Sequence, residues 1–292
     1  QKCTIPVLVI GGGSNIVVSD KGFRGLVIKP QFLDFSVQKA EGETTKFNAI
    51  TPRHKQLSNK ACYQVPHLSS FSEDDERVWV TVGSGWKINA LIQKLLSEGI
   101  VGLEWFSGIP GSIGGAVYMN IHGGSYFFSD FVVKVETLSL DGEYKVYTSE
   151  KMKFDYDFSH LHSSKEVVLS VTLELFKGSV TRAQEIVRNW GTKKIAAQPQ
   201  RSAGCIWQNL SEKERAKQKF SSPSIGYILD TQLNFAGKQI GGAIISTKHA
   251  AFIVNLGNAT ASDVSSLVKL VETEFAKRYG IRLKREVEFI GE

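Results

Sequence analysis

The apolar residues of this chain fall in short runs, and their spacing predicts a mixture of strands and helices. Some runs are continuous and bounded by glycine, as in short buried strands, whereas others alternate with polar residues, as in a half-buried sheet. Asp141-Gly142 adds a hairpin turn between two such segments. Strands are therefore predicted at residues 7–10, 25–28, 77–82, 132–140, 144–147, 166–176 and 286–290.

Three other segments place their apolar residues on one face of a helix. They cover residues 86–98, 181–194 and 261–279. Gly99 and Gly280 stand where the first and the last of them should end, and Thr260 with Asp263 resembles a capping box. Residues 40–76 are polar and weakly periodic, so we expect a long loop or strand pair there. Because strands and helices mix without strict alternation, the predicted fold class is α+β.

The composition indicates how large a core the chain can form and argues against several classes of protein. With 292 residues, 42% of them hydrophobic, the chain can bury a large core and form two or three sub-domains. No apolar run approaches the ~20 residues of a membrane span, and no signal-peptide pattern opens the chain. The three cysteines show no disulfide or zinc spacing. We therefore expect a cytoplasmic protein with no metal site and no membrane partner.

The net charge of +6 fits either nucleic-acid binding or a lysine-rich surface with a site for an anionic ligand. The basic residues are spread along the chain, and no nucleic-acid-binding motif is present. The one cluster, at residues 213–219, is mixed with glutamates and indicates a solvated helix or loop. The second interpretation is favoured, with small-molecule partners and no nucleic acid.

Two glycine-rich segments are the first candidates for a binding site. Residues 11–15 (GGGSN) follow a predicted strand but match neither G-x-G-x-x-G nor a P-loop, so a tight turn explains them equally well. Residues 107–116 hold four glycines and a proline in ten positions, which lets the backbone approach a ligand closely. Two such segments in one chain suit a ligand with two phosphates and a large aromatic body, such as FAD.

Taken in order, several motifs resemble those of the UDP-N-acetylenolpyruvoylglucosamine reductase (MurB) family. They are IPVLVIGGGSN at 5–15, GLE at 102–104, GIPGSIGGAVYMN at 108–120, SAGC at 202–205, HAAFIVN at 249–255 and LKREVEFIG at 283–291. The resemblance implies an FAD-binding domain of the vanillyl-alcohol-oxidase type at 1–178, with sub-domains at 1–30 and 31–178. A smaller α+β domain for the UDP-sugar would follow at 179–292, with the strand at 286–291 returning to the active site.

The resemblance also implies a monomeric enzyme that reduces UDP-N-acetylglucosamine enolpyruvate to UDP-N-acetylmuramate for peptidoglycan synthesis, with FAD as cofactor and NADPH as co-substrate. In the family motifs, Cys205 holds the position of the acid that protonates the enolate, and Glu286 that of the glutamate that polarises it. A thiol with an ordinary pKa of about 8.5 is mostly protonated at neutral pH and can act as an acid. Cys205 could instead be an inert buried thiol, and Glu286 a surface charge.

The remaining implied contacts fall in two groups. The cofactor would lie against Gly11, Gly12, Gly13, Ser14, Asn15, Gly108, Ile109, Pro110, Gly111, Ser112, Gly114, Gly115, Ala116, Asn120 and His122. The substrate would lie against Tyr156, Ser159, Gln208, Asn209 and Tyr227, whereas a polar surface helix explains most of residues 207–230 equally well. His249 fits either a packed structural residue or a contact.

The chain departs from the family pattern at three places. Asp157 stands where the family has the arginine of Tyr-Arg-x-Ser, and a carboxylate would repel the developing enolate. Three explanations stay open: another cation substitutes, with Lys153, Arg182 or Lys194 as candidates, the alignment to the family motif is shifted here, or the substrate or reaction has changed. His122 replaces a small residue and either supplies positive charge or is a core histidine, with covalent flavin attachment a weaker option. The family's strand and helix before residue 5 are also missing from the sequence.

These departures keep two alternatives open. One is a flavin oxidase or dehydrogenase that acts on another sugar or alcohol. The other is a flavin- or UDP-sugar-binding protein that has lost its activity. Oxidation of NADPH that depends on the enolpyruvyl substrate would separate the reductase from both.

Overall fold

The computed structural model describes residues 5–42, 69–72, 74–124 and 126–291. The chain divides into two compact units, unit 1 (residues 1–13 and 25–193) and unit 2 (residues 14–24 and 194–292). This division differs from the expected boundary at residue 178, since most of the helix after it belongs to unit 1 and a short early segment belongs to unit 2. Most of the loop or strand pair expected at 40–76 lies outside the described residues.

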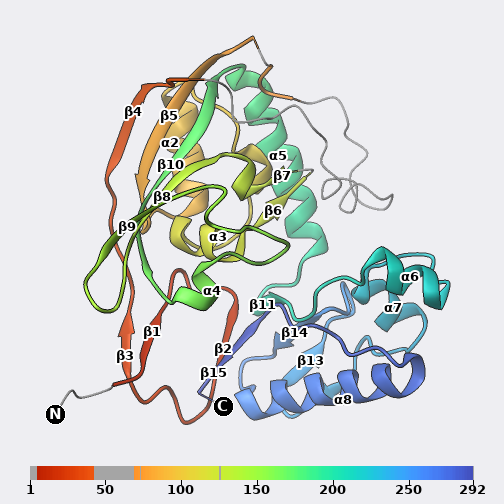
Figure 1. Cartoon of the computed structure of the whole chain (residues 1–292). Helices are drawn as coiled ribbons and strands as arrows, with labels where there is room; N and C mark the ends of the chain where they lie inside the picture. Colours follow the sequence, from red (N-terminus) through yellow and green to blue (C-terminus); the bar gives the residue numbers. More distant parts are fainter. Residues whose placement is uncertain (1–4, 43–68, 73, 125, 292) are drawn as a thin grey trace. The chain divides into compact units, whose positions relative to one another are not determined.

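Unit 1 is built on a five-stranded antiparallel sheet with the order β4-β5-β10-β8-β9. Strands β5 and β10 form its centre, and Figure 1 shows them side by side. Their inward side chains are valines and leucines, as the alternating pattern predicts. The strands are β4 (Phe35–Lys39), β5 (Glu76–Gly83), β8 (Val132–Leu138), β9 (Tyr144–Thr148) and β10 (Val167–Lys177).

Helices α2, α3 and α5 pack on this sheet and close the core of unit 1. The buried face of α2 consists of the apolar residues that predicted it. The elements are α2 (Ile88–Ser97), α3 (Ile113–Met119), α4 (Leu161–Ser164) and α5 (Val180–Ala197), with short 3-10 turns at Glu104–Phe106 and Phe128–Asp130. Two small pairs, β1 (Val7–Val9) with β3 (Leu26–Ile28) and β6 (His122–Gly123) with β7 (Tyr126–Phe127), complete the unit.

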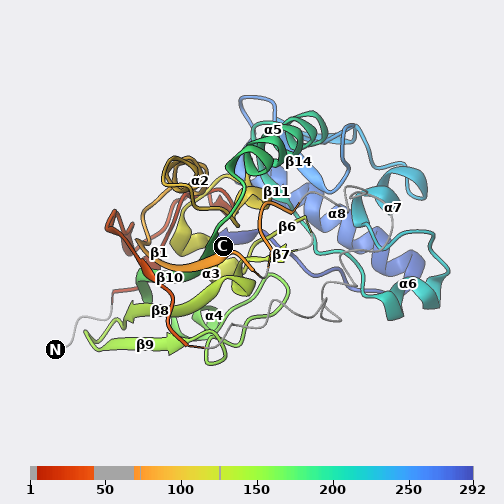
Figure 2. The same cartoon turned by 90° about the horizontal axis from the view of Figure 1, so that it is seen from above.

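Unit 2 holds a four-stranded antiparallel sheet with the order β11-β14-β13-β12. Helix α8 packs on this sheet, and α7 lies beside α8 in Figures 1 and 2. A parallel pair joins β2 to β15, so the early segment 14–24 is bound to the C-terminal strand. The elements are β2 (Ile16–Val18), β11 (Ser202–Cys205), α6 (Glu212–Gln218), α7 (Ile225–Thr231), β12 (Gln239–Ile240), β13 (Ala243–Ile245), β14 (Phe252–Asn255), α8 (Ala261–Tyr279) and β15 (Glu288–Ile290).

Helix α8 confirms the sequence prediction in detail. Thr260 accepts a hydrogen bond from the Asp263 N–H, and Asp263 accepts one from the Thr260 N–H, which is the expected capping box. The backbone N–H of Thr260 beside Asp263 lowers the pKa of that carboxyl. Gly280 ends the helix in a left-handed conformation. None of the helices in the described ranges is long and apolar enough to cross a membrane.

Asp20 adds a second, long-range cap to α8. Its carboxylate accepts hydrogen bonds from the N–H groups of Ala261 and Ser262 at 2.8 and 3.1 Å. Because unsatisfied N–H groups at a helix start favour an anion, Asp20→Ala should lower the free energy of unfolding by about 1 kcal/mol. Chemical denaturation measures this loss. Asp20→Asn should lose less, since its amide oxygen still accepts, and an alanine variant as stable as the parent would contradict the cap.

Candidate functional site

The two glycine-rich segments meet within unit 1. A Cβ added at Gly11 would lie 2.5 Å from the Ser112 Oγ, and one added at Gly12 would lie 2.7 Å from the Gly111 Cα. Such distances are too short for any larger residue, so the close approach requires glycine at both positions. Gly13, Gly108 and Gly111 also have positive φ angles. The two glycine segments therefore pack directly against each other, as expected if both contribute backbone N–H groups to one phosphate-binding site.

The second glycine segment is only partly a loop, which corrects its interpretation from the sequence. Its last residues belong to α3, whose N-cap is Ser112, and the Ser112 hydroxyl accepts a hydrogen bond from the Gly115 N–H. Gly114 lies against Ser84, where an added Cβ would come within 3.1 Å. Ala116 is buried in the core. The helix stays hidden in the sequence because glycine has low helix propensity, whereas tertiary packing determines the structure here.

Asn120 ends α3 in a left-handed conformation and is 1% exposed. Its amide donates to the carbonyl of Asp155 at 2.9 Å and accepts from the N–H of Ser129 at 2.9 Å. These bonds tie three segments of unit 1 together. The structure thus gives Asn120 a positioning role, and its contact with the cofactor stays a prediction.

The two departures noted in the sequence, at His122 and Asp157, are neighbours in the fold. The His122 Nε2 lies 4.0 Å from the Asp157 Oδ1, and the Asp157 side chain is only 4% exposed. His122 also stacks on the ring of Tyr156, with centroids 5.3 Å apart. Because a buried carboxylate is stabilised by a nearby cation, a protonated His122 would offset the charge that replaces the family arginine. When His122 is protonated, the pair carries no net charge.

Tyr156 and Ser159 lie on either side of this aspartate in the chain, and they differ in their surroundings. Tyr156 belongs to the aromatic group formed with His122 and Phe127. Ser159 is fully buried, and its hydroxyl donates to the carbonyl of Tyr118 at 2.7 Å. Tyr156 is therefore the better candidate for a ligand contact, whereas Ser159 holds its turn against the end of α3.

Cys205 lies at the end of β11 in unit 2, where it pairs with Phe252 of β14. It is half-buried and not in a disulfide. Lys194 is close enough to interact electrostatically with the thiol, although the two are eleven positions apart. Desolvation lowers the pKa of the Lys194 ammonium to about 8, and the interaction with Cys205 opposes that shift. A proton donor and a partly desolvated cation are therefore brought together in unit 2.

The backbone of Glu286 lies beside the residue that follows Cys205. Its N–H donates to the carbonyl of Ile206 at 2.8 Å, and its carbonyl accepts from the amide of Asn15 at 3.0 Å. Ser14 and Asn15 thus belong to unit 2, whereas the glycines before them belong to unit 1. The chain order did not reveal this split. The structure therefore joins the backbone of the predicted glutamate to the residue next to the predicted acid, within one unit. Glu286 itself lies just before β15, so the strand expected at 286–290 begins two residues later.

The stretch that carries Gln208, Asn209 and Tyr227 has a mainly structural arrangement. The Gln208 N–H donates to the carbonyl of Lys284 at 2.9 Å. The Asn209 side chain accepts from the N–H of Ile225 at 3.2 Å and thereby caps α7. Tyr227 lies in the first turn of α7 and is 46% exposed. Of these three predicted substrate residues, Asn209 and Tyr227 are exposed, and the Asn209 side chain is already used as a cap, so Tyr227 is the better candidate for a ligand contact.

His249 proves to be a packed residue. Its Nδ1 accepts a hydrogen bond from the Ala251 N–H at 3.3 Å, and an added Cβ at Gly226 would clash with its ring. Burial lowers the pKa of His249, which favours the neutral form. Of the two options that the sequence left open, the structure favours the structural one.

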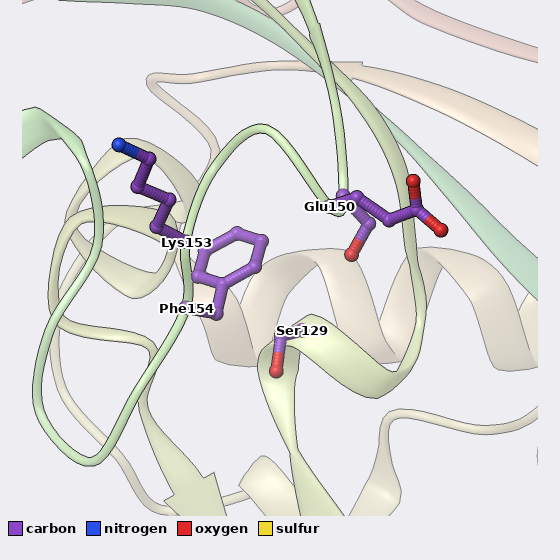
Figure 3. A pocket seen from close by; sticks show the side chains of 5 residues that line it. Ser129, Glu150, Lys153 and Phe154 are labelled. Carbon is purple, nitrogen blue, oxygen red and sulfur yellow. The ribbon is translucent and has the colours of Figure 1, made fainter.

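A shallow pocket of about 280 Å³ lies in unit 1, lined by Ser129, Ser149, Glu150, Lys153 and Phe154. Figure 3 shows the Lys153 ammonium pointing away from the Glu150 carboxylate and the Ser129 hydroxyl. A carboxylate in the lining disfavours an anionic ligand, so this pocket does not support Lys153 as the substitute cation. Among the described residues, no group of three or more His, Cys, Asp and Glu side chains could hold a metal ion.

Comparison with known proteins gives a consistent result. Residues 65–147 match the FAD binding domain family, and residues 197–290 match the C-terminal domain of UDP-N-acetylenolpyruvoylglucosamine reductase. The chain is 32% identical to the UDP-N-acetylenolpyruvoylglucosamine reductase of Agathobacter rectalis, covering 100% of this chain and 82% of that protein. It is 33% identical to that of Lactobacillus johnsonii, covering 98% and 81%.

The fold is also similar to that of a solved structure. The crystal structure of the UDP-N-acetylenolpyruvylglucosamine reductase (MurB) from Thermus caldophilus superposes with a TM-score of 0.70 at 28% identity. The match covers 98% of this chain and 86% of that one. The similarity therefore includes both units, with the glycine segments in one and Cys205 and Glu286 in the other.

Proposed function

Because the chain belongs to the UDP-N-acetylenolpyruvoylglucosamine reductase family, we propose that it reduces UDP-N-acetylglucosamine enolpyruvate to UDP-N-acetylmuramate. NADPH is the electron source and FAD the cofactor. The observation that carries the proposal is the hydrogen bond from the Glu286 N–H to the carbonyl of Ile206, the residue after Cys205, which brings the two candidate residues into one part of unit 2. The enzyme acts as a monomer in the cytoplasm, where peptidoglycan precursors are made and NADPH is available.

The glycine surface of unit 1 fits the pyrophosphate of FAD. Gly11 and Gly12 lie so close to the second glycine segment that a side chain at either would collide with it, which keeps the backbone N–H groups of the two segments near one another. Ser112 and Gly115 follow at the start of α3 and continue this surface. When bound, FAD supplies the redox chemistry, because it carries two electrons from NADPH to the substrate. The protein's own groups then have to hold the substrate, supply a proton and stabilise negative charge.

Cys205 supplies the proton in this proposal. Reduction of the enolpyruvyl double bond adds hydrogen to both of its carbons, and the second hydrogen arrives as a proton. The Cys205 S–H bond breaks, the substrate carbon gains the proton and the sulfur becomes a thiolate. Glu286, whose backbone N–H is bonded to the residue after Cys205, acts on the enolate that precedes this transfer. The thiolate is then reprotonated from solvent or from a neighbouring acid.

Lys194 is the cation that this proposal assigns to the enolate. Asp157 occupies the position of the family arginine, and even with a protonated His122 4.0 Å away, that pair offers no net positive charge. Lys194 lies in the same unit as Cys205 and interacts with it electrostatically. Partial desolvation strengthens the attraction of an ammonium for a developing anion. Arg182 lies twelve positions earlier, in the first turn of α5, and has no such observation in its favour.

Gly12→Ala tests the glycine surface. The added methyl would come within 2.7 Å of the Gly111 Cα and force the two segments apart. FAD affinity should fall about tenfold or more, equivalent to about 1.4 kcal/mol, as measured by fluorescence titration. Gly191→Ala is the matched control, because that position in α5 faces open space and alanine is the better helix former. Equal FAD affinity for both variants would contradict the assignment.

The function itself is tested by NADPH oxidation with the purified, FAD-loaded protein, with and without UDP-N-acetylglucosamine enolpyruvate. Oxidation that depends on this substrate is the expected result. The His122–Asp157 pair favours one competing function, a flavin oxidase or dehydrogenase on another sugar or alcohol. Flavin reduction without any response to the enolpyruvyl substrate would overturn the reductase. Electron transfer to oxygen with a different sugar would then support the competing function.

A further inference from the structure

Three chain segments meet around Asn15 in unit 2. Strand β2 pairs in parallel with β15, with Ile16 opposite Glu288, and Figure 1 shows the two strands side by side. The carbonyl of Asn15 accepts from the Glu288 N–H at 3.1 Å and so opens this ladder. The third segment, β11, ends at Cys205 and lies next to the stretch that precedes β15. Asn15 therefore stands at the point where the ladder of β2 and β15 begins.

The Asn15 side chain extends the ladder beyond its last backbone bond. Its amide nitrogen donates to the carbonyl of Glu286 at 3.0 Å. On its other side, the Glu286 N–H donates to the carbonyl of Ile206 at 2.8 Å. The backbone of Glu286 is thus held by two hydrogen bonds, one from Asn15 and one to the residue after Cys205. Losing either would free that backbone to rotate and would move the carboxylate.

Asn15 also faces the strand that carries the cysteine. A Cβ added at Gly204 would lie 3.9 Å from the Asn15 Oδ1, so the α-carbon of Gly204 looks toward the amide oxygen. Gly204 has a φ of +95°, a conformation that larger residues rarely adopt, and it immediately precedes Cys205. The side-chain amide of Asn15 therefore bonds to the backbone of Glu286 and lies near Gly204, the residue before Cys205.

We propose that Asn15 is a positioning residue, which fixes the Glu286 carboxylate relative to the Cys205 thiol. This inference rests on the proposed reductase function, because it assigns roles to Cys205 and Glu286. The sequence-based expectation, a contact between Asn15 and the cofactor, predicts a different experimental result. A positioning residue affects the step that needs the acid and the glutamate, and leaves the reduction of the flavin by NADPH unchanged.

The experiment separates the two half-reactions by stopped-flow absorbance of the bound flavin. In Asn15→Ala, reduction by NADPH should match the parent, whereas reoxidation by the enolpyruvyl substrate should slow about 10- to 100-fold. Reoxidation should be slower still in Asn15→Asp, because a carboxylate would then face the Glu286 carbonyl in place of the amide donor. Asp20→Ala is the control, since it lies on the same segment and weakens only the cap of α8.

A double variant tests whether Asn15 acts through Glu286. In a Glu286→Gln background, adding Asn15→Ala should slow reoxidation by a smaller factor than it does in the parent, because the carboxylate that Asn15 positions is already gone. Fully additive losses would overturn the proposal. So would a variant in which FAD affinity or both half-reactions fall together, which is the behaviour of a cofactor contact.

A second readout does not depend on turnover. With Cys3 and Cys62 replaced by serine, iodoacetamide reacts with Cys205 alone at a rate set by its exposure and thiolate content. Asn15→Ala should change this rate about threefold or more, and Asp20→Ala should leave it unchanged. A parent enzyme that ignores the enolpyruvyl substrate would defeat the proposed function, whereas an unchanged alkylation rate would defeat the positioning role.

Discussion

Cys205→Ala is expected to slow reoxidation of the flavin by the enolpyruvyl substrate by about 10²- to 10⁴-fold, the usual contribution of a positioned acid. The thiol is half-buried and lies near an ammonium group, so it is protected from bulk solvent and electrostatically coupled. Alanine removes the only labile proton of this side chain. Water would then have to protonate the enolate, from a less favourable position. Stopped-flow absorbance of the flavin measures the rate.

Cys205→Ser is the informative companion variant. Its hydroxyl keeps a transferable proton at nearly the same place and should recover most of the lost rate. Solvent deuterium should slow reoxidation in the parent and in the serine variant, because a proton moves from sulfur or oxygen to carbon. Reduction by NADPH should be equal in all three proteins, since that step does not use the thiol. An alanine variant that reoxidises at the parent rate would remove Cys205 from the mechanism.

The elements that the sequence predicts well are those with a strong local signal. Helix α8 matches residues 261–279 because its apolar stripe, its capping box and Gly280 all agree. Helix α3 was missed because two glycines lie inside it, and only its packing in unit 1 stabilises it. Strand β2 was missed because its partner, β15, lies about 270 residues later in the chain, a distance at which local pattern carries no information.

In the candidate site, too, the sequence does not show which distant residues come together. Motif spacing identifies Cys205 and Glu286 as residues with chemical roles, but it does not show that the Glu286 N–H bonds to the residue after Cys205. His122 and Asp157 appear in the sequence as two unrelated departures, and only the fold shows that their side chains lie 4.0 Å apart. Similarly, Asn15 follows three glycines in the chain and therefore resembles part of their loop, although it belongs to the other unit. Pairings between distant residues are what the sequence alone does not determine.

Lys194→Met is expected to lower the rate of reoxidation by about 10²- to 10³-fold, the usual effect of removing one group that stabilises a developing oxyanion. Methionine keeps the length and packing of the lysine stem while removing its charge. Lys193→Met is the matched control, because Lys193 is the preceding residue and is exposed. Equal losses in both variants would indicate a general effect of positive charge on substrate binding instead of a specific role for Lys194.

The pH dependence of flavin reoxidation tests the charge of Lys194 in a second way. Desolvation lowers the pKa of Lys194 to about 8, so the ammonium is present below that pH and is lost as the pH rises through it. Reoxidation should therefore fall above about pH 8 in the parent, and Lys194→Arg should keep its rate to higher pH, because a guanidinium stays charged. The Cys205 thiol is a second ionisable group next to this lysine. In a Cys205→Ser background the hydroxyl does not titrate there, so a fall that persists near pH 8 belongs to Lys194, and one that disappears belongs to the thiol.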